Sequence, residues 1–284
     1  MRPLIIFHGA CPDGAGSALA AFKRFGEGAD YRPTLYDSEP PRWEEYAGRD
    51  VFMIDFSYSR AIVEDMASRC NLRIIDHHKS AEENLRGLPY ATFDMRHSGA
   101  TLAWMHFFPA EPIPELLQYI EDRDLWRWKL PHSKEVSGAL KAMGATVDFR
   151  VLIPILEEWR PDEPSGLVVG SKRRLIAEGR AILLCESAMV EAMLKTAEQV
   201  VLAEHDAMAC NTSVLFSEVP NRLLEEYRFP MAIGWFWDGA RRAYQVSLRS
   251  VGDFDCTAVA RKFGGGGHRN ASGFTCKELP WRAK

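Results

Sequence analysis

The sequence predicts an α/β protein with an N-terminal domain on a mainly parallel sheet, a helical connector and a smaller C-terminal α/β domain. Short apolar runs alternate with helical patterns in the first third of the chain, as in β-α-β units. A long helical pattern follows at 171–198, and the pattern beyond it changes to strands. We therefore expect domains at 1–135 and 199–284, joined by a helical connector at 136–198.

The first domain shows three strand patterns, at 4–7, 51–54 and 72–75. Helical patterns lie between and after them, at 16–24, 60–68, 99–108 and 114–122. A Pro- and Gly-containing segment at 160–166 predicts a loop before the connector helix. The sequence thus predicts β-α-β units followed by a helical region.

In the C-terminal domain, strand patterns at 231–237 and 243–248 flank Asp238-Gly239, a strong hairpin-turn signal. A helical pattern at 257–263 then leads into a run of four glycines at 264–267. These patterns predict a small α/β domain that contains a hairpin.

Composition and charge limit the classes of function. The 284 residues are 46% apolar and 26% charged, which suits two globular cores. Six cysteines without a C-x-x-C pair predict reduced thiols, and a net charge of −4 disfavours long duplex nucleic acid as a partner. The apolar run at 4–7 is too short for a signal peptide or a membrane span. We expect a cytoplasmic protein with no membrane partner.

Side chains that can bind metal follow each of the three N-terminal strands. His8 follows the first strand, Asp55 the second, and the Asp-His-His run at 76–78 the third. Ligands at the carboxyl ends of parallel strands converge on one crevice. Asp-His-His alone could equally be a solvated strand end, but with His8, Asp13 and Asp55 it favours a metal site. Because successive side chains of extended backbone alternate in direction, at most two of the three enter one metal shell.

Two segments resemble the DHH/DHHA1 superfamily. The first, IIDHH at 74–78, is similar to the DHH signature. The second comprises YQVSLRS at 244–250 and FGGGGHRNASGF at 263–274, and it resembles a DHHA1 domain. The superfamily includes short-oligonucleotide RNases, single-strand exonucleases, cyclic-dinucleotide phosphodiesterases and manganese pyrophosphatases. The resemblance covers most of the chain and implies a metal-dependent phosphoesterase.

The resemblance also implies roles for particular residues. The metal ligands would be His8, Asp13, Asp55, His77 and Asp122. Asp55 would bridge two ions, and Asp124 competes with Asp122 for its place. His78 would face the substrate phosphate or the leaving group, while Asp76 would bind metal or support a histidine. Mixed carboxylate and imidazole ligands favour one or two Mn²⁺ ions, with Mg²⁺ or Co²⁺ possible.

The sequence departs from the superfamily pattern at the first motif. Ala15 stands where many members carry a second aspartate, and the spacing from His8 to Asp13 is one residue longer than usual. The second metal is then weakly held, completed by another ligand such as Asp124, or absent. Cys11 lies in the insert and can in principle bind metal, although a small buried thiol is the favoured interpretation.

The glycine run in the C-terminal domain lets main-chain N–H groups approach a phosphate closely. A flexible loop is the alternative, but neighbouring basic side chains favour an anion site. We expect these residues to bind substrate: Arg249, Gly265, Gly266, Gly267, His268 and Arg269. In the N-terminal domain, the first N–H groups of the helix at 99–108 are expected to assist phosphate binding.

The expected function is hydrolysis of a phosphodiester in a short nucleotide, cleaved from a terminus, with Asp55, Asp76 and His78 taking part in catalysis. The alternatives are a phosphomonoesterase on 3′,5′-bisphosphate nucleosides and an exopolyphosphatase. From a different class, the loss of an aspartate at Ala15 allows a catalytically inactive nucleotide sensor. The sequence leaves the oligomeric state open, and a dimer is possible.

Overall fold

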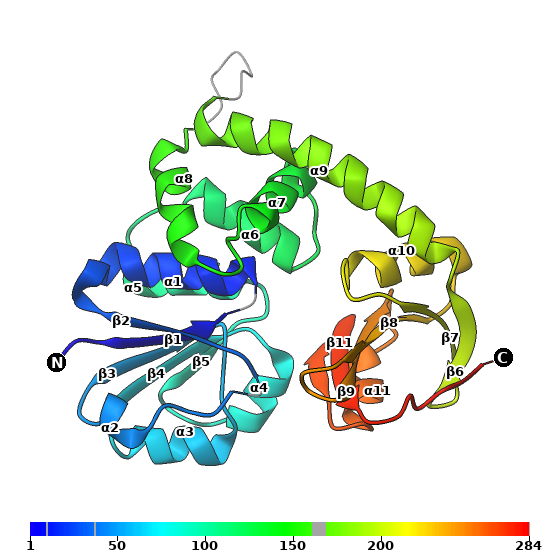
Figure 1. Cartoon of the computed structure of the whole chain (residues 1–284). Helices are drawn as coiled ribbons and strands as arrows, with labels where there is room; N and C mark the ends of the chain where they lie inside the picture. Colours follow the sequence, from blue (N-terminus) through cyan, green and yellow to red (C-terminus); the bar gives the residue numbers. More distant parts are fainter. Residues whose placement is uncertain (10, 37, 161–168, 284) are drawn as a thin grey trace. The chain divides into compact units, whose positions relative to one another are not determined.

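The computed structural model of the chain describes residues 1–9, 11–36, 38–160 and 169–283 (Figure 1). The chain divides into two compact units, Met1–Leu183 and Leu184–Lys284, and each is described by itself. Most of the loop expected at 160–166 lies outside the described residues. None of the helices in the described ranges is both long and apolar enough to cross a membrane.

The first unit contains a five-stranded sheet in the order β2-β1-β3-β4-β5, and every pair in it is parallel. Its strands are β1 (Leu4–His8), β2 (Asp30–Thr34), β3 (Asp50–Ile54), β4 (Asn71–Asp76) and β5 (Ala91–Phe93). The three strands expected from their apolar runs are confirmed. The pattern missed β2, which carries Pro33 at the sheet edge, and β5, which has only three residues.

Helices cover both faces of this sheet, as Figure 1 shows. On one face lie α1 (Pro12–Phe25) and α5 (Gly99–Phe107), and on the other α2 (Trp43–Tyr46) and α3 (Arg60–Ala67). The side chains of β1 alternate between the two cores, with Ile5 and Phe7 in one and Leu4 and Ile6 in the other. Because both faces of β1 are buried, all of its residues from Leu4 to Phe7 are apolar.

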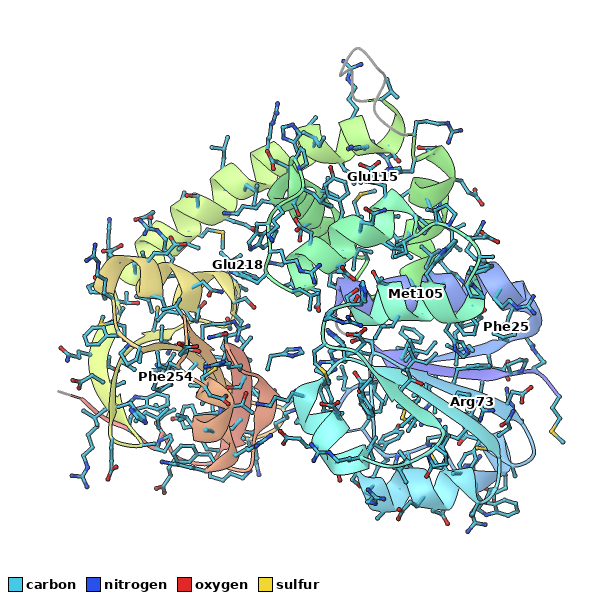
Figure 2. The ribbon with its side chains drawn as sticks, turned by 180° about the vertical axis from the view of Figure 1, so that it is seen from behind. Phe25, Arg73, Met105, Glu115, Glu218 and Phe254 are labelled. Atoms are coloured by element: carbon cyan, nitrogen blue, oxygen red, sulfur yellow. The ribbon has the colours of Figure 1, made fainter. Side chains whose placement is uncertain are left out.

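The core on the α1 side extends from the sheet into aromatic packing between helices. Phe25, which Figure 2 labels, lies at the end of α1. Its ring centroid is 5.6 Å from that of Phe52 in β3 and 5.5 Å from that of Phe107 in α5. The remaining short elements of this region are η1 (Gly26–Gly28) and α4 (Lys79–Leu85). The aromatic contacts hold α1 and α5 together on this face of the sheet.

Helix α1 begins four residues earlier than expected. Cys11 caps it, because its Sγ accepts a hydrogen bond from the Gly14 N–H at 3.2 Å, and Pro12 occupies the first helical position. Asp13 consequently lies in the first turn of a helix rather than in a loop. The sequence pattern missed this start because cysteine is an uncommon cap.

A helical layer completes the first unit. It consists of α6 (Glu115–Asp124), α7 (Ser133–Ala142), η2 (Phe149–Val151), α8 (Leu152–Glu158) and the first part of α9 (Gly170–Leu194). Val136, Leu152 and Leu175 from these helices share one core with α1. The long helix expected at 171–198 is confirmed, although it ends earlier, at Leu194. The last residue of the expected range, Glu198, is the first residue of β6. The three-part division at 135 and 198 remains a prediction.

The second unit is a seven-stranded sheet in the order β10-β11-β9-β8-β7-β6-β12. Its strands are β6 (Glu198–Leu202), β7 (His205–Asn211), β8 (Met231–Asp238), β9 (Ala243–Ser250), β10 (Gly266–His268), β11 (Ala271–Cys276) and β12 (Arg282–Ala283). All pairs are antiparallel except β7 with β8, which are joined through α10 (Glu218–Tyr227). Besides α10 and the end of α9, the unit contains α11 (Cys256–Arg261).

The expected hairpin of β8 and β9 is confirmed, with a connection of four residues. Asp238 pairs with Ala243, and its Oδ1 accepts the N–H groups of Ala240 and Arg241, which holds the turn. The sheet has a core on each face: α11 packs on one side, and α10 with the end of α9 packs on the other. The unit is thus a compact α/β layer structure, as the sequence predicts.

Two helix glycines make a matched test of the packing between α7 and α9. A Cβ at Gly179 would lie 1.9 Å from the carbonyl oxygen of Glu135, so the two helices would have to separate. A Cβ at Gly138 would meet nothing closer than 3.6 Å. We expect Gly179→Ala to lower the free energy of unfolding by about 1–3 kcal/mol. Gly138→Ala should raise it by about 0.5–1 kcal/mol. Denaturant unfolding measures both, and equal effects would contradict the close packing.

Candidate metal centre

The carboxyl ends of β1, β3 and β4 bring the expected metal-binding side chains together at one edge of the parallel sheet. Three groups within the N-terminal unit have ligand atoms that all lie within 4.8 Å of one another: His8, Cys11 and Asp55; Asp13, Asp55 and His77; Asp55, Asp76 and His78. Asp55 belongs to all three groups. The convergence expected from the strand ends is therefore present, with this carboxylate at its centre.

Asp55 is placed by a sharp change of direction at the end of β3. Its φ is 55°, a left-handed conformation that is uncommon outside glycine, and its N–H donates to the carbonyl of Ile75 at 3.0 Å. The side chain is buried. Burial and the nearby Asp13 carboxylate raise the pKa of Asp55. The backbone thus turns a buried carboxylate toward the histidines.

Asp13 ties α1 to the start of α5. Its two carboxylate oxygens accept the N–H groups of Gly99 at 2.6 Å and Ala100 at 3.0 Å. We expected these helix N–H groups to assist phosphate binding, but the structure gives them to Asp13. Gly99 is required here, because a Cβ would lie 2.5 Å from the Cβ of Asp55. Burial and the Asp124 carboxylate raise the pKa of Asp13.

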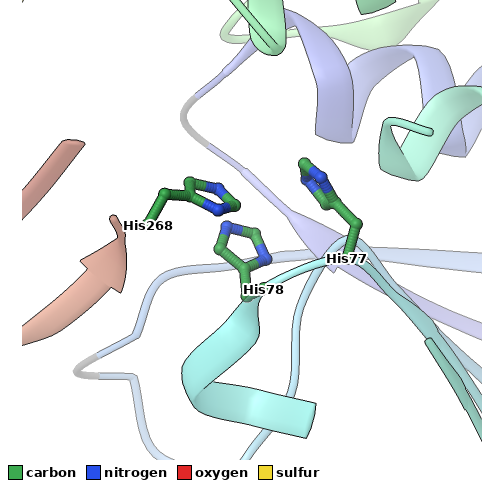
Figure 3. Close-up of side chains that lie close together, drawn as sticks. All are labelled: His77, His78 and His268. Atoms are coloured by element: carbon green, nitrogen blue, oxygen red, sulfur yellow. The ribbon is translucent and has the colours of Figure 1, made fainter. Parts of the chain in front are cut away.

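His77, which Figure 3 shows beside His78, lies among three carboxylates. Its Nε2 is 3.2 Å from Asp55 Oδ1, 3.5 Å from Asp13 Oδ2 and 3.6 Å from Asp124 Oδ2. Burial opposes protonation of the ring, but the bond to Asp55 and the other carboxylates raise the pKa of His77 to about 10. A buried proton held by three acids marks a place where a cation is electrostatically favoured.

The structure brings Asp124, and not Asp122, to this cluster. Asp124 Oδ2 is buried and accepts no hydrogen bond from the described residues. Asp122 faces elsewhere, because its carboxylate accepts the N–H groups of Lys129 at 2.9 Å and Leu130 at 3.1 Å. It therefore holds the turn that follows α6. Of the two alternatives that the sequence offers, Asp124 has the position of a ligand.

Asp76 orients His78. Its Oδ1 lies 2.7 Å from His78 Nδ1 and accepts the His77 N–H, and its Oδ2 accepts the Ser57 hydroxyl at 2.6 Å. Burial alone would raise the pKa of Asp76, but the charge of His78 and these hydrogen bonds lower it. Burial likewise opposes the charged form of His78, yet Asp76 raises the pKa of His78. Sequence reasoning missed Ser57, and only its position two residues after Asp55 hinted at it.

His8 and Cys11 complete the cluster on the β1 side. His8 Nδ1 lies 3.1 Å from Cys11 Sγ and 3.8 Å from Asp55 Oδ2. Burial lowers the pKa of His8 more than Asp55 raises it, so the neutral ring is favoured as a ligand. Burial and the charge of Asp55 raise the pKa of the Cys11 thiol.

The donor set fits a divalent cation. It offers two imidazole nitrogens, two buried carboxylates and the half-buried carboxylate of Asp124, whose Oδ2 accepts no hydrogen bond from the described residues. Oxygen and nitrogen donors without a pair of thiolates suit Mn²⁺ or Mg²⁺ more than a structural zinc site. The residues that would hold the ion are His8, Asp13, Asp55, His77 and Asp124.

Ala15, the position that departs from the superfamily pattern, faces the hydrophobic core. It is 3% exposed and lies in the cluster that includes Ile5, Leu19 and Ala100. Because α1 already begins at Pro12, residues 13 and 15 point to different sides of the helix. Asp13 reaches the cluster while Ala15 does not.

The substrate-binding residues expected in the second unit lie around β9, β10 and the turn into β11. Arg249 donates from Nη1 to Ser247 Oγ at 2.8 Å and from Nη2 to Ser217 Oγ at 2.6 Å. Arg269 donates to the carbonyl and carboxylate of Asp253, at 2.6 and 3.1 Å. His268 is the last residue of β10 (Figure 3), and its carbonyl accepts the Thr257 hydroxyl. A role of these side chains in binding phosphate remains a prediction.

The glycine run has a packing reason of its own. A Cβ at Gly265 would lie 2.1 Å from the carbonyl oxygen of Gly273, and one at Gly267 would lie 2.6 Å from that of Ala271. Gly267 also has a φ of 133°. Close pairing with β11 therefore requires glycine at 265 and 267 whether or not a phosphate binds.

Comparison with known proteins agrees with this fold. Residues 211–283 match the DHHA1 domain family. An uncharacterised protein of Acanthamoeba polyphaga mimivirus is 32% identical over 294 residues, an alignment that covers 95% of this chain. The chain spans 66% of that protein's length, just under two thirds.

Solved structures show the same fold at low identity. RecJ from Thermus thermophilus, in complex with Mn²⁺, has a TM-score of 0.56 at 15% identity, covering 97% of this chain and 49% of RecJ. PggH, a pGpG-specific phosphodiesterase from Vibrio cholerae, has a TM-score of 0.50 at 12% identity, covering 97% and 93%. An exopolyphosphatase-related protein from Bacteroides fragilis has a TM-score of 0.50 at 15% identity, covering 98% and 87%.

Residues 211–283 thus belong to the DHHA1 domain family, and the chain shares its fold with RecJ and PggH. The parallel N-terminal sheet with its Asp-His-His strand end and the C-terminal DHHA1 domain have the order that the sequence predicts. The fold class and the DHHA1 domain expected from the sequence are confirmed, and the shared fold supports the resemblance to the DHH/DHHA1 superfamily.

The two aspartates of α6 give a direct test of the ligand set. We expect Asp124→Asn to weaken Mn²⁺ binding by about ten- to a hundredfold, and not to destabilise the metal-free fold, because it removes a buried charge near other acids. Asp122→Asn should instead lower the free energy of unfolding by about 1–3 kcal/mol. The carboxylate oxygens of Asp122 accept two backbone N–H groups, and the asparagine side chain has only one oxygen to accept them. Calorimetry with Mn²⁺ and thermal unfolding in chelator separate the effects, and the reverse pattern would restore Asp122 as the ligand.

The core position of Ala15 predicts the outcome of restoring the missing aspartate. Ala15→Asp should bury a carboxylate among apolar side chains and destabilise the protein by several kcal/mol, about 2–4. Ala15→Asn is the uncharged control of equal size and should cost less. The Mn²⁺ stoichiometry of folded Ala15→Asp should stay as in the wild type. A tighter or additional Mn²⁺ site in calorimetry would show that residue 15 reaches the cluster.

Proposed function

We propose that the protein is a divalent-metal-dependent phosphodiesterase that hydrolyses short oligonucleotides or dinucleotides from a terminus. The observation that carries this proposal is the place of Asp55, one buried carboxylate shared by three groups of ligands at the strand ends. In the proposed centre, Mn²⁺ is held by His8, Asp13, Asp55, His77 and Asp124, and Mg²⁺ or Co²⁺ can replace it. Asp124 takes the place first given to Asp122.

The bound cations would activate a water and neutralise charge on the phosphate. The side chains around them are rigid, because Asp13 is fixed by two backbone N–H groups and Asp76 by four hydrogen bonds. Asp76 keeps His78 in one orientation and favours its charged form, which suits donation to a phosphate oxygen or to the leaving group. In this proposal Asp55 organises the cluster and His78 acts on the substrate.

The second unit would hold the phosphate at the substrate's end. The Arg249 guanidinium is held by Ser217, Ser247 and the Leu248 carbonyl. In this proposal its fixed positive charge attracts the phosphate. His268 and Arg269 would contribute beside it. Because close strand pairing explains the glycines at 265 and 267, this part of the proposal depends mainly on the basic side chains. A terminal phosphate grip would favour short substrates cleaved from one end.

One similar structure supports a nucleotide substrate, a second supports Mn²⁺ as the metal, and a third keeps an alternative open. The first two are a pGpG-specific phosphodiesterase and RecJ with Mn²⁺, and the third is an exopolyphosphatase-related protein. Polyphosphate hydrolysis and removal of one phosphate from 3′,5′-bisphosphate nucleosides need the same metal centre. We further propose that the enzyme acts in the cytoplasm, where its six unpaired thiols would persist.

A substrate panel with Mn²⁺ tests the function. We expect the highest kcat/KM on dinucleotides and short oligonucleotides, and less on cyclic dinucleotides, bisphosphate nucleosides and polyphosphate. Asp55→Asn should lower kcat by at least about a hundredfold, since a preorganised charge at the reaction centre is lost. The fold should survive, because the pKa of Asp55 is already raised.

The control is Asp50→Asn, at the exposed start of the same strand, which should keep wild-type rates. A clear preference for bisphosphate nucleosides or polyphosphate would replace the phosphodiesterase proposal by the corresponding alternative. Binding of nucleotides without turnover of any member would indicate the inactive sensor.

A further inference from the structure

Cys11 lies inside the proposed metal centre, between two of its ligands. Its Sγ is 3.1 Å from His8 Nδ1 and 3.4 Å from Asp55 Oδ2, and those two atoms are 3.8 Å apart. The three side chains form a group of ligand atoms that is distinct from the one around His77. The β1 side of the centre thus offers one nitrogen, one sulfur and one oxygen.

The three distances fit coordination of one ion. In a tetrahedral site with metal–sulfur bonds of about 2.3 Å and nitrogen or oxygen bonds of about 2.0–2.2 Å, neighbouring donors lie roughly 3.3–3.6 Å apart. The separations of 3.1, 3.4 and 3.8 Å bracket that range. Shifts of a few tenths of an ångström would place all three donors on one cation.

The backbone fixes the sulfur in this position without a metal. Cys11 is the N-cap of α1 and accepts the Gly14 N–H at 3.2 Å, so its sulfur already acts as an acceptor at a helix N-terminus. Gly14 allows the helix to meet β1, because a Cβ there would lie 1.9 Å from the carbonyl oxygen of His8. The cap, the helix start and the strand end therefore form one rigid unit around His8.

The first motif also lacks a donor that the thiol can supply. The second aspartate of the superfamily pattern is replaced by Ala15, which is buried in the apolar core. Cys11 reaches the cluster at the other side of the helix start, beside His8.

We propose that Cys11 is a metal ligand, which with His8 and Asp55 holds a thiophilic divalent cation such as Zn²⁺, Cd²⁺ or Co²⁺. This inference rests on the metal centre of the proposed function. On binding, the thiol proton passes to solvent and the thiolate coordinates the ion. The second group, around His77, keeps oxygen and nitrogen donors and suits Mn²⁺. The two halves of the centre thus differ in metal preference.

Cobalt spectroscopy of the full chain tests the assignment independently of activity. The chelator-treated protein is titrated with Co²⁺ without oxygen, and thiolate ligation gives a sulfur-to-cobalt charge-transfer band in the near ultraviolet. We expect the band in the wild type and its absence in Cys11→Ser, whose hydroxyl keeps an acceptor for the Gly14 N–H. Cys185→Ser, at an exposed position of α9, is the matched control and should keep the band.

Metal affinities provide a second readout. Cys11→Ser should weaken Cd²⁺ binding by at least about tenfold, because the loss of even a residue that only supports a metal ligand typically lowers metal affinity by that much. Mn²⁺ affinity should change much less. In the wild type at alkaline pH, where some Cys11 thiolate forms despite its raised pKa, Cd²⁺ should slow alkylation of Cys11 relative to the chelator-treated protein, as followed by mass spectrometry, while exposed Cys185 stays reactive. The protection experiment needs no variant, so it remains decisive if Cys11→Ser fails to fold.

The outcomes separate this inference from the proposed function. Co²⁺ binding without a charge-transfer band, or a band that persists in Cys11→Ser, would reduce Cys11 to a helix cap and leave the metal centre standing. Failure of the wild type to bind Co²⁺, Cd²⁺ or Mn²⁺ would overturn both. Loss of the band in Cys11→Ser, with Mn²⁺ binding retained, is the result that we expect.

Discussion

The negative charge collected around His77 is the constraint on which the N-terminal unit depends. Asp13, Asp55 and Asp124 surround one imidazole nitrogen, and burial raises the pKa of each carboxylate. Three such groups cannot stay ionised together in a poorly solvated site unless a proton or a cation lies between them. Although burial opposes protonation, these carboxylates raise the pKa of His77 to about 10, so a proton on its ring is favoured where no cation is bound.

The surrounding helices and strands hold these charged side chains in place. The N–H groups at the start of α5 satisfy Asp13, while the parallel strands end at a common edge and deliver Asp55 and His77. Gly14 and Gly99 stand at two close approaches of helix to strand end. A cation bound only by the folded state would add its binding free energy to stability, so folding and metal binding are coupled.

The sequence predicts the features that depend on local pattern. Apolar runs located β1, β3 and β4, and their parallel arrangement followed from the helical patterns between them, so the ligands at their ends could be expected to converge. The choice between Asp122 and Asp124 could not be made, because it depends on backbone donors at 129 and 130. Likewise, the direction of residue 15 depends on a cysteine cap, which shifts the start of α1.

If the proposed function is correct, the negative charge around His77 also determines the order in which metal and substrate bind. A phosphate approaching buried carboxylates is repelled, whereas cations among them reverse the sign of the local field. Substrate affinity then requires the metal, and by reciprocity the substrate's phosphate strengthens metal binding. The metal centre thus selects for a phosphate ester but not for a particular base or chain length. Those preferences have to come from contacts beyond the scissile phosphate, and in the proposed function Arg249, held by two serine hydroxyls, provides one of them.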